Sequence, residues 1–158
     1  MVNTMNEYEE KLKKYMKENC VVGEHLSFGQ SCHSVEEAAQ AANANNHDFV
    51  KNICMIDSNG NLIVAIVKGE DRASTSRVEK TLNIERPRIA TSEEILQKTS
   101  YPCGGTPSFG YNATFLVDPR VMEKEVVYSG GGSENSLVKI STKELQKANK
   151  GKIVRVRK

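Results

Sequence analysis

The segment FVKNICMIDSNGNLIVAIV, residues 49–67, consists of two apolar runs separated by a polar turn. The runs, at 49–56 and 62–67, are rich in the β-branched and aliphatic residues that favour strands. Between them lies DSNGN, and Asn-Gly is the strongest short-range signal for a β-hairpin. The segment therefore predicts two antiparallel strands.

Helix-start signals lie on both sides of this hairpin. In each, a Ser or Thr is followed three residues later by a Glu, so that both side chains can satisfy free N–H groups of a first helical turn. These pairs are Ser34 with Glu37, Ser76 with Glu79, Thr91 with Glu94, and Ser141 with Glu144. An amphipathic segment predicts an N-terminal helix over about 5–19.

Further strand-like runs are found at 113–117, 125–128, 137–140 and 153–156. Helices and strands therefore alternate, yet the central hairpin is antiparallel. This combination favours an α/β or α+β fold with a mixed sheet over a purely parallel one. No repeat or linker divides the chain, so we expect a single domain over residues 1–158.

The composition is that of a globular protein. Of 158 residues, 38% are hydrophobic and 27% are charged, which disfavours disorder and a disulfide scaffold. The longest apolar run, 62–67, is far shorter than a membrane helix. The first residues lack a basic start followed by an apolar stretch, so they do not resemble a secretory signal. We expect a cytoplasmic protein without a membrane partner.

Metal binding has little support in the sequence. The four cysteines, at positions 20, 32, 54 and 103, include no C-x-x-C pair, which zinc sites and redox dithiols usually show. The nearest approach to a ligand cluster is formed by Cys20, His25, Cys32 and His33, but its spacing matches no common zinc pattern. We expect no metal and no cofactor.

Positive charge is concentrated at the C-terminal end. Residues 139–158 contain eight Lys and Arg residues against one acidic residue, Glu144, and so contribute +7 to an overall charge of +2. The rest of the chain therefore carries −5. Such a cluster either attracts a phosphate backbone or forms a solvated, solubilising tail.

Two glycine-rich loops and one lysine are the candidates for a site. The loops are GGTPSFG at 104–110 and GGG at 130–132. They fit no phosphate-binding motif, and such loops are either structural turns or ligand cradles. Lys51 lies in a strand whose two faces are both mainly apolar. It either protects a sheet edge or reaches solvent at the end of the sheet, or it is a cation held at the mouth of a pocket to bind a carbonyl or phosphate oxygen.

The common catalytic constellations are missing. The sequence contains no G-x-S-x-G motif, no H-E-x-x-H motif and no evident pair of carboxylates. The three histidines precede Lys51 without a matching nucleophile pattern. From its residues alone, the chain is a compact domain with one unusual lysine and two glycine loops.

Taken in order, several motifs resemble the YbaK/EbsC family of aminoacyl-tRNA editing domains, a fold also inserted in bacterial prolyl-tRNA synthetases. The resemblance covers roughly residue 34 to the C-terminus. It is carried by SVEEAA at 34–39, FVKNI at 49–53, VKGEDR at 67–72, CGGTPSFG at 103–110 and VYSGGG at 127–132. Ser108 departs from the proline that is frequent in the family, which leaves the amino-acid specificity open.

The resemblance implies a mixed, largely antiparallel, barrel-like sheet surrounded by helices. It also implies hydrolysis of the ester between a wrong amino acid, typically Ala or Cys, and tRNA for proline, with a prolyl-tRNA synthetase as a further partner. Lys51 would hold the aminoacyl ester or the nearby terminal adenosine, and the nucleophile would be water, a ribose hydroxyl or a substrate thiol. Substrate-binding residues would be Gly104, Gly105, Thr106, Pro107, Ser108, Gly110, Ser129, Gly130 and Gly131.

Residues for contact with tRNA would be Arg72, Lys152, Arg155 and Arg157. Because the chain is too short to include a synthetase core, we expect a freestanding enzyme that edits in trans. Two alternatives are a tRNA- or synthetase-binding module without catalysis and a sensor of small aminoacyl or nucleotide molecules, since function follows the site and not the fold.

Overall fold

The computed structural model describes residues 5–32 and 34–158, so His33 of the weighed metal cluster lies outside the described residues. The described helices are α1 (Met5–Glu18), α2 (Val35–Ala42), α3 (Thr75–Leu82), α4 (Ser92–Thr99), α5 (Pro119–Met122), α6 (Thr142–Asn149) and the 3-10 turn η1 (Asn46–Asp48). The strands are β1 (Gly23–Ser27), β2 (Val50–Ile56), β3 (Leu62–Lys68), β4 (Arg88–Ile89), β5 (Thr114–Val117), β6 (Val126–Gly130), β7 (Ser136–Ser141) and β8 (Lys152–Ile153).

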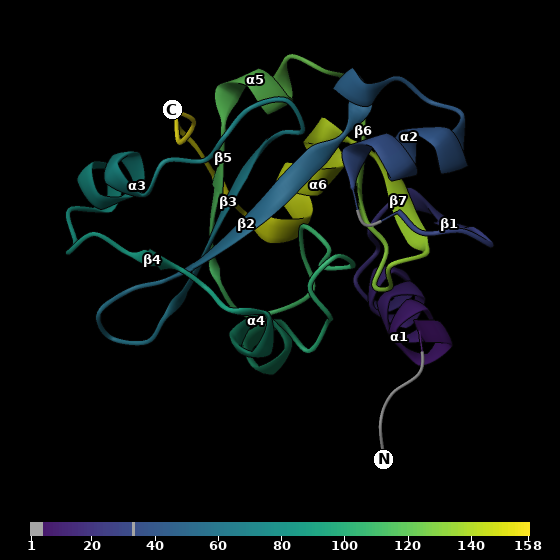
Figure 1. The fold of residues 1–158 in the computed structure, drawn as a ribbon, viewed down its shortest axis with the longest axis horizontal. Helices are drawn as coiled ribbons and strands as arrows, with labels where there is room; N and C mark the ends of the chain where they lie inside the picture. Colours follow the sequence, from purple (N-terminus) through teal and green to yellow (C-terminus); the bar gives the residue numbers. More distant parts are fainter. Residues whose placement is uncertain (1–4, 33) are drawn as a thin grey trace.

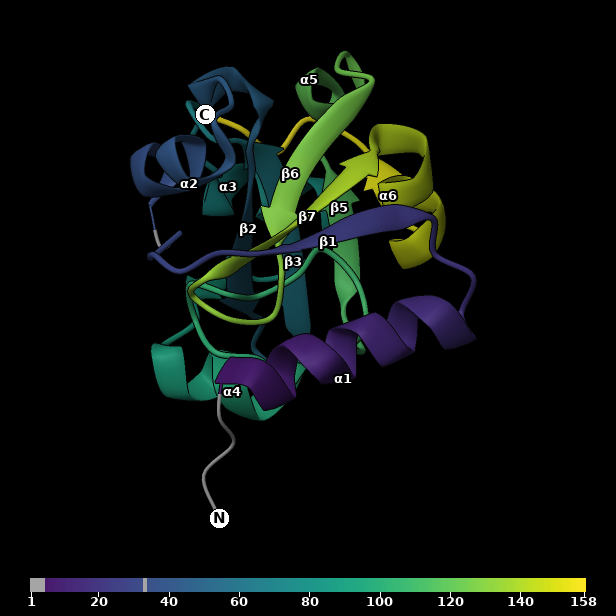
Figure 2. The same cartoon turned by 90° about the vertical axis from the view of Figure 1, so that its right-hand side faces the viewer.

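The strands form two sheets. One has three strands in the order β1-β7-β6, and the other has five in the order β4-β2-β3-β5-β8. Figure 2 shows the three-stranded sheet in front of the other, with α1 running below it. A parallel bridge between Phe49 and Tyr128 links the sheets, but they do not close into a barrel. The mixed α/β fold is confirmed, and the barrel-like outline is approximate.

The hairpin at the centre of the sequence is confirmed. β2 and β3 pair antiparallel from Ile56 with Leu62 to Val50 with Lys68, and they form the long ribbon at the middle of Figure 1. β5 then lies parallel to β3, and β8 lies parallel to β5. The five-stranded sheet is therefore mixed, and the three-stranded sheet is antiparallel.

Three of the four helix starts are confirmed. The hydroxyls of Ser34, Thr91 and Ser141 accept hydrogen bonds from the backbone N–H three residues on, and Thr91 forms a complete capping box. The start at Ser76 is wrong, because Ser74 caps α3. The N–H of Ser74 donates to the carbonyl of Val156 (2.7 Å), which holds this residue extended and begins the helix two residues earlier.

Two strands were not predicted, and one prediction was too long. β1 and β4 carry little apolar alternation and exist through pairing with β7 and β2. The strand predicted at 153–156 shortens to β8 because the N–H groups of Val156 and Arg157 donate to the Asp118 carboxylate instead of to a neighbouring strand.

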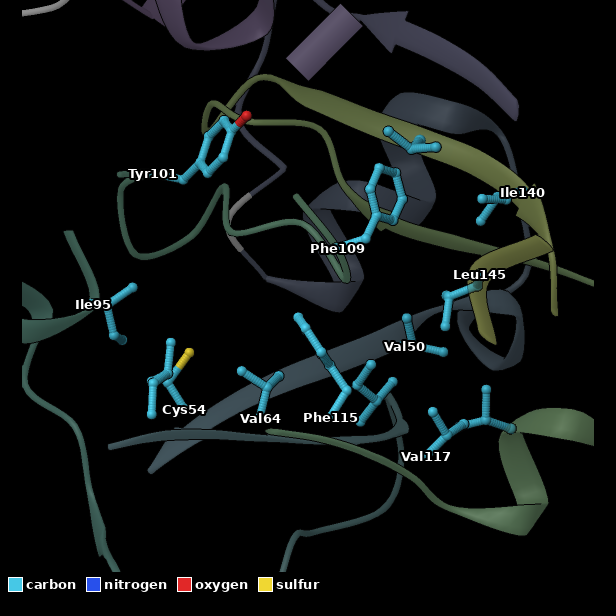
Figure 3. Close-up of a cluster of buried hydrophobic side chains, with 14 of the residues drawn as sticks. Val50, Cys54, Val64, Ile95, Tyr101, Phe109, Phe115, Val117, Ile140 and Leu145 are labelled. Carbon is cyan, nitrogen blue, oxygen red and sulfur yellow. The ribbon is translucent and has the colours of Figure 1, made fainter. Parts of the chain in front are cut away.

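The main hydrophobic core lies between the two sheets. There, side chains of the five-stranded sheet such as Cys54 and Val64 face Phe109 and Ile140 (Figure 3). A second cluster on the opposite face includes Met55 with residues from α3 and the C-terminal segment. Both faces of β2 are thus buried, as the apolar alternation indicated. None of the described helices combines the length and hydropathy that a bilayer-spanning segment needs.

Candidate functional site

A cavity of about 210 Å³ opens where the two sheets approach each other. Its walls come from α2, the first half of β2, the loop that follows α4, and the end of β6. Apolar walls are formed by residues such as Val35, Ala38, Phe49, Tyr128 and Leu137; polar groups come from Lys51, Asn52, Gly104, Thr106, Ser129 and Gly130.

Between the bridge of Phe49 to Tyr128 and the last two residues of β2, which pair with β4, the edge of β2 that faces the cavity is not paired with another strand. The carbonyl of Phe49 accepts from Gly69 on the β3 side (2.8 Å), whereas the carbonyl of Cys54 accepts from Ala90 on the opposite side (2.9 Å). Because ladder groups alternate along an antiparallel strand, the backbone N–H and C=O of Asn52 point to the open edge. Within the described residues, neither the pairing with β3 nor that with β4 uses these two groups.

Lys51 lies at this edge, half-buried, and lines the same cavity as Gly104. Burial in the cavity wall lowers the pKa of its amine below the usual 10.5, and the nearby charge of Arg72 acts in the same direction. The carboxylates of Asp71 and Glu70 oppose this shift. The amine is therefore a cation with an incomplete solvent shell, which suits it to bind an oxygen of a ligand.

The two glycine loops are packed directly against each other. The N–H of Gly132 donates to the carbonyl of Gly105 (2.8 Å). A Cβ on Gly130 would lie well inside 3.0 Å of the Thr106 carbonyl oxygen, and a Cβ on Gly105 would lie 2.7 Å from the backbone of Ser133. These glycines are needed for close approach of backbones, so that the two loops form one wall.

The predicted substrate-binding residues divide into three groups. Gly104, Thr106, Ser129 and Gly130 line the cavity. Four others are buried near this wall without lining it, namely Gly105, Pro107, Ser108 and Gly131. Gly110 lies elsewhere, packed near the ring of Tyr15 on α1 at a positive φ of 99°.

Asn52 belongs to the site, and sequence reasoning did not single it out. Its amide contacts the glycine loop and β6, with Nδ2 donating to the Thr106 carbonyl (3.0 Å) and Oδ1 accepting from the Ser108 hydroxyl (2.6 Å). A signal was present, because Asn52 shares an apolar strand face with Val50 and Cys54, and a buried amide needs partners.

The residues predicted to contact tRNA differ in their exposure and in their partners. Arg72, Lys152 and Arg155 are exposed. The N–H of Lys158 donates to the carbonyl of Arg72 (2.8 Å), so the basic C-terminal end lies beside the segment that follows β3. Arg157 differs, because its guanidinium donates to the buried carboxylate of Asp118 (2.8 Å). This contact gives Arg157 a structural role.

The histidine and cysteine candidates for a metal are not gathered. Cys20 is exposed, Cys32 lies in the cavity wall, and His25 Nε2 hydrogen-bonds the Gly131 carbonyl (2.8 Å). Within residues 5–32 and 34–158, no group of three or more His, Cys, Asp or Glu side chains is placed to hold an ion. The absence of a metal stays a prediction.

The cavity that Lys51 shares with a backbone-lined glycine wall is the candidate ligand-binding site of this mixed α/β fold. The chain belongs to the aminoacyl-tRNA editing domain family, whose model matches residues 30–148. This confirms the resemblance seen in the sequence.

Relatives match over most of their own length. The chain is 22% identical over 128 residues to the uncharacterized protein YwhH of Bacillus subtilis (strain 168), covering 80% of this chain and 81% of that protein. The solved structure of hypothetical protein APE2540 is 25% identical, with a TM-score of 0.86 over 94% of this chain and 99% of that one.

A second similar structure is that of a proposed trans-editing enzyme for prolyl tRNA synthetase. It is 20% identical, with a TM-score of 0.88 over 100% of this chain and 99% of that one. This likeness establishes the shared fold.

Proposed function

We propose that this protein is a freestanding hydrolase that removes a wrongly attached amino acid from tRNA, with Ala- or Cys-tRNA for proline as its substrate. The observation that carries the proposal is that Lys51 and residues of both glycine loops line one small cavity. Family membership and the fold shared with the proposed prolyl trans-editing enzyme support it.

The size of the cavity suits a small acyl group. At about 210 Å³ it is smaller than the roughly 300–1,000 Å³ of pockets that enclose a drug-sized ligand. A short side chain and its ester carbonyl would enter, while the nucleotide that carries them stays at the mouth. Larger amino acids would be excluded sterically, which is needed because one methylene changes binding by only about 1–3 kcal/mol.

The reacting carbonyl would be bound by groups of residues that line the cavity. As water adds to the ester carbon, negative charge develops on the carbonyl oxygen, which a cation and a free N–H stabilise. Lys51 supplies the cation, and the open edge of β2 at Asn52 supplies the N–H. Because an aminoacyl ester is already activated, such positioning is sufficient without a protein nucleophile. Water, a ribose hydroxyl or the thiol of a cysteinyl substrate would attack the carbonyl.

The tRNA body would be bound outside the cavity, at the exposed cations Arg72, Lys152 and Arg155. Arg72 acts on the Lys51 amine electrostatically, beside the carboxylates of Asp71 and Glu70, so a path of cations would run from the cavity to the surface. A phosphate backbone would follow such a path and would add a salt-dependent share of the affinity.

Deacylation of charged tRNA tests the proposal. The purified protein is incubated with tRNA for proline that carries alanine, cysteine, serine or proline, and ester loss is followed over time. We expect the alanyl or cysteinyl ester to be cleaved and the prolyl ester to survive. Lys51→Ala should lose cleavage and keep tRNA binding, whereas Lys80→Ala on α3 should behave as the wild type. A wild type that binds every charged tRNA and cleaves none would instead identify a binding module.

A further inference from the structure

Three polar side chains from three separate elements form a closed hydrogen-bonded ring in the wall of the cavity. Asn52 comes from β2, Ser108 from the first glycine loop and Ser129 from β6. The Ser108 hydroxyl donates to Asn52 Oδ1 (2.6 Å) and lies 2.6 Å from the Ser129 hydroxyl, and Asn52 Nδ2 reaches Ser129 Oγ (3.4 Å). Ser108 and Ser129 are 0% and 1% exposed, so bulk water has little access to their hydroxyls.

The protons of the ring can be assigned one by one. A serine hydroxyl has a single proton. Because Ser108 gives its proton to Asn52 Oδ1, the short contact between the two hydroxyls requires Ser129 to donate to Ser108. One Nδ2 proton of Asn52 then points to Ser129 Oγ, and the other is donated to the Thr106 carbonyl (3.0 Å). No proton of the ring is left for a ligand.

The ring therefore holds parts of the site together. It ties the strand that carries Lys51 to the carbonyl of Thr106, against which Gly130 is packed without room for a side chain. A second tie comes from α6, where Asn149 Nδ2 donates to the Ser108 carbonyl (3.0 Å). These hydrogen bonds thus fix the distance between the strand that carries Lys51 and the glycine loop.

We propose that Asn52 is a positioning residue whose amide, through Ser108 and Ser129, sets the distance between the Lys51 strand and the glycine loop. This inference rests on the proposed function for its effect on catalysis, but its effect on the loop is independent of any activity. Removing the amide opens the ring and releases the Thr106 carbonyl, so the reacting groups move apart while the cavity keeps most of its walls.

The test compares Asn52→Ala, Ser108→Ala and the double variant in the full chain. Val78→Ala is the matched control, because Val78 is buried in the cluster on the other face of the sheet and its truncation destabilises the fold without touching the ring. Amide hydrogen exchange is measured over residues 104–110, and kcat and KM are measured with the best ester substrate of the wild type.

We expect exchange over 104–110 to rise about tenfold more in Asn52→Ala than in Val78→Ala, because these amides open locally once the ring is broken. We expect kcat to fall roughly 100-fold, as for a displacement of reacting groups by about 1 Å, with little change in KM. The kcat of the double variant should be no lower than that of the slower single variant, since either change opens the same ring.

The inference is overturned if Asn52→Ala shows the loop exchange and the kcat of Val78→Ala, or if the two single effects multiply in the double variant. If the wild type cleaves no ester, the proposed function fails. The exchange measurement then still decides the role of Asn52, because it needs no substrate.

Discussion

Gly130 lies so close to the carbonyl oxygen of Thr106 that a Cβ on Gly130 would come well inside 3.0 Å of it. The two residues belong to loops that are more than twenty positions apart in the chain, and their contact makes one wall of the cavity.

Gly130→Ala should therefore separate the loops and abolish ligand binding. The added Cβ meets backbone atoms that cannot rotate away, so either β6 or the 104–110 loop must shift. We expect a lowered melting temperature and the loss of binding to a non-hydrolysable alanyl amide of adenosine. Gly29→Ala is the control, because nothing lies within 4 Å of its added Cβ. Unchanged binding by Gly130→Ala would show that this wall is not part of the site.

Binding of the same analogue should depend on the charge of Lys51. Burial lowers the pKa of the amine from 10.5, and Arg72 adds to this effect. The cation is therefore present at low pH and is lost, as pH rises, before an ordinary lysine would lose it. We expect the affinity to fall through a midpoint below pH 10.5, as measured by calorimetric titration at several pH values.

Lys51→Arg distinguishes this explanation from a general effect of alkaline pH. Arginine stays protonated throughout this range, so the fall in affinity should disappear in the variant if a cation is what the ligand requires. A fall that persists unchanged in Lys51→Arg would assign the titration to another group.

Neutralising the exposed cations should weaken tRNA binding in a salt-dependent way. We expect Arg72→Gln, Lys152→Gln and Arg155→Gln each to reduce the slope of log affinity against log salt by about 1 if the side chain contacts a phosphate. Fluorescence titration of labelled tRNA at several salt concentrations measures this slope. Lys14→Gln on the exposed face of α1 serves as the control, and equal slopes in all four variants would leave the C-terminal cations as a solubilising surface.

Asp118→Asn should destabilise the protein by roughly 3–5 kcal/mol, as expected for breaking a buried charge pair. Burial alone would raise the pKa of the Asp118 carboxyl, but hydrogen bonds from the N–H groups of Arg120, Val156 and Arg157, together with the Arg157 charge, lower it below 3.8. The carboxylate therefore stabilises the fold above pH 3.8, and this contribution is lost as pH falls through the lowered pKa.

Urea unfolding at neutral and acidic pH measures both effects. The stability of Asp118→Asn should vary less with pH over the acidic range than that of the wild type. The double variant with Arg157→Gln should be less destabilised than the sum of the single variants. Additive losses would show that the two side chains act independently.

Much of the fold could be predicted because its signals are local. The β2–β3 hairpin follows from an Asn-Gly turn between two apolar runs, and the starts of α2, α4 and α6 follow from hydroxyl and carboxylate side chains three residues apart. These interactions act within one turn of chain, so neighbouring residues are enough to determine them.

The other features of the fold depend on contacts between residues that are far apart in the chain. Ser74 and not Ser76 caps α3 because the C-terminal segment pairs with the Ser74 backbone. Arg157, predicted as a tRNA contact, has its guanidinium on Asp118, 39 positions away. No pattern of nearby residues encodes such a partner.

The candidate site likewise combines local sequence signals with contacts that only the tertiary structure creates. The sequence by itself indicated a lysine in an apolar strand, two glycine loops and the family to which they belong. Only the tertiary structure brought Lys51 and Gly104 to one cavity and enclosed Asn52 with Ser108 and Ser129 in a ring. The physical reason is range: turns and caps arise from contacts along the chain, whereas a cavity and a buried polar network exist only once packing has excluded water from groups that the chain holds apart.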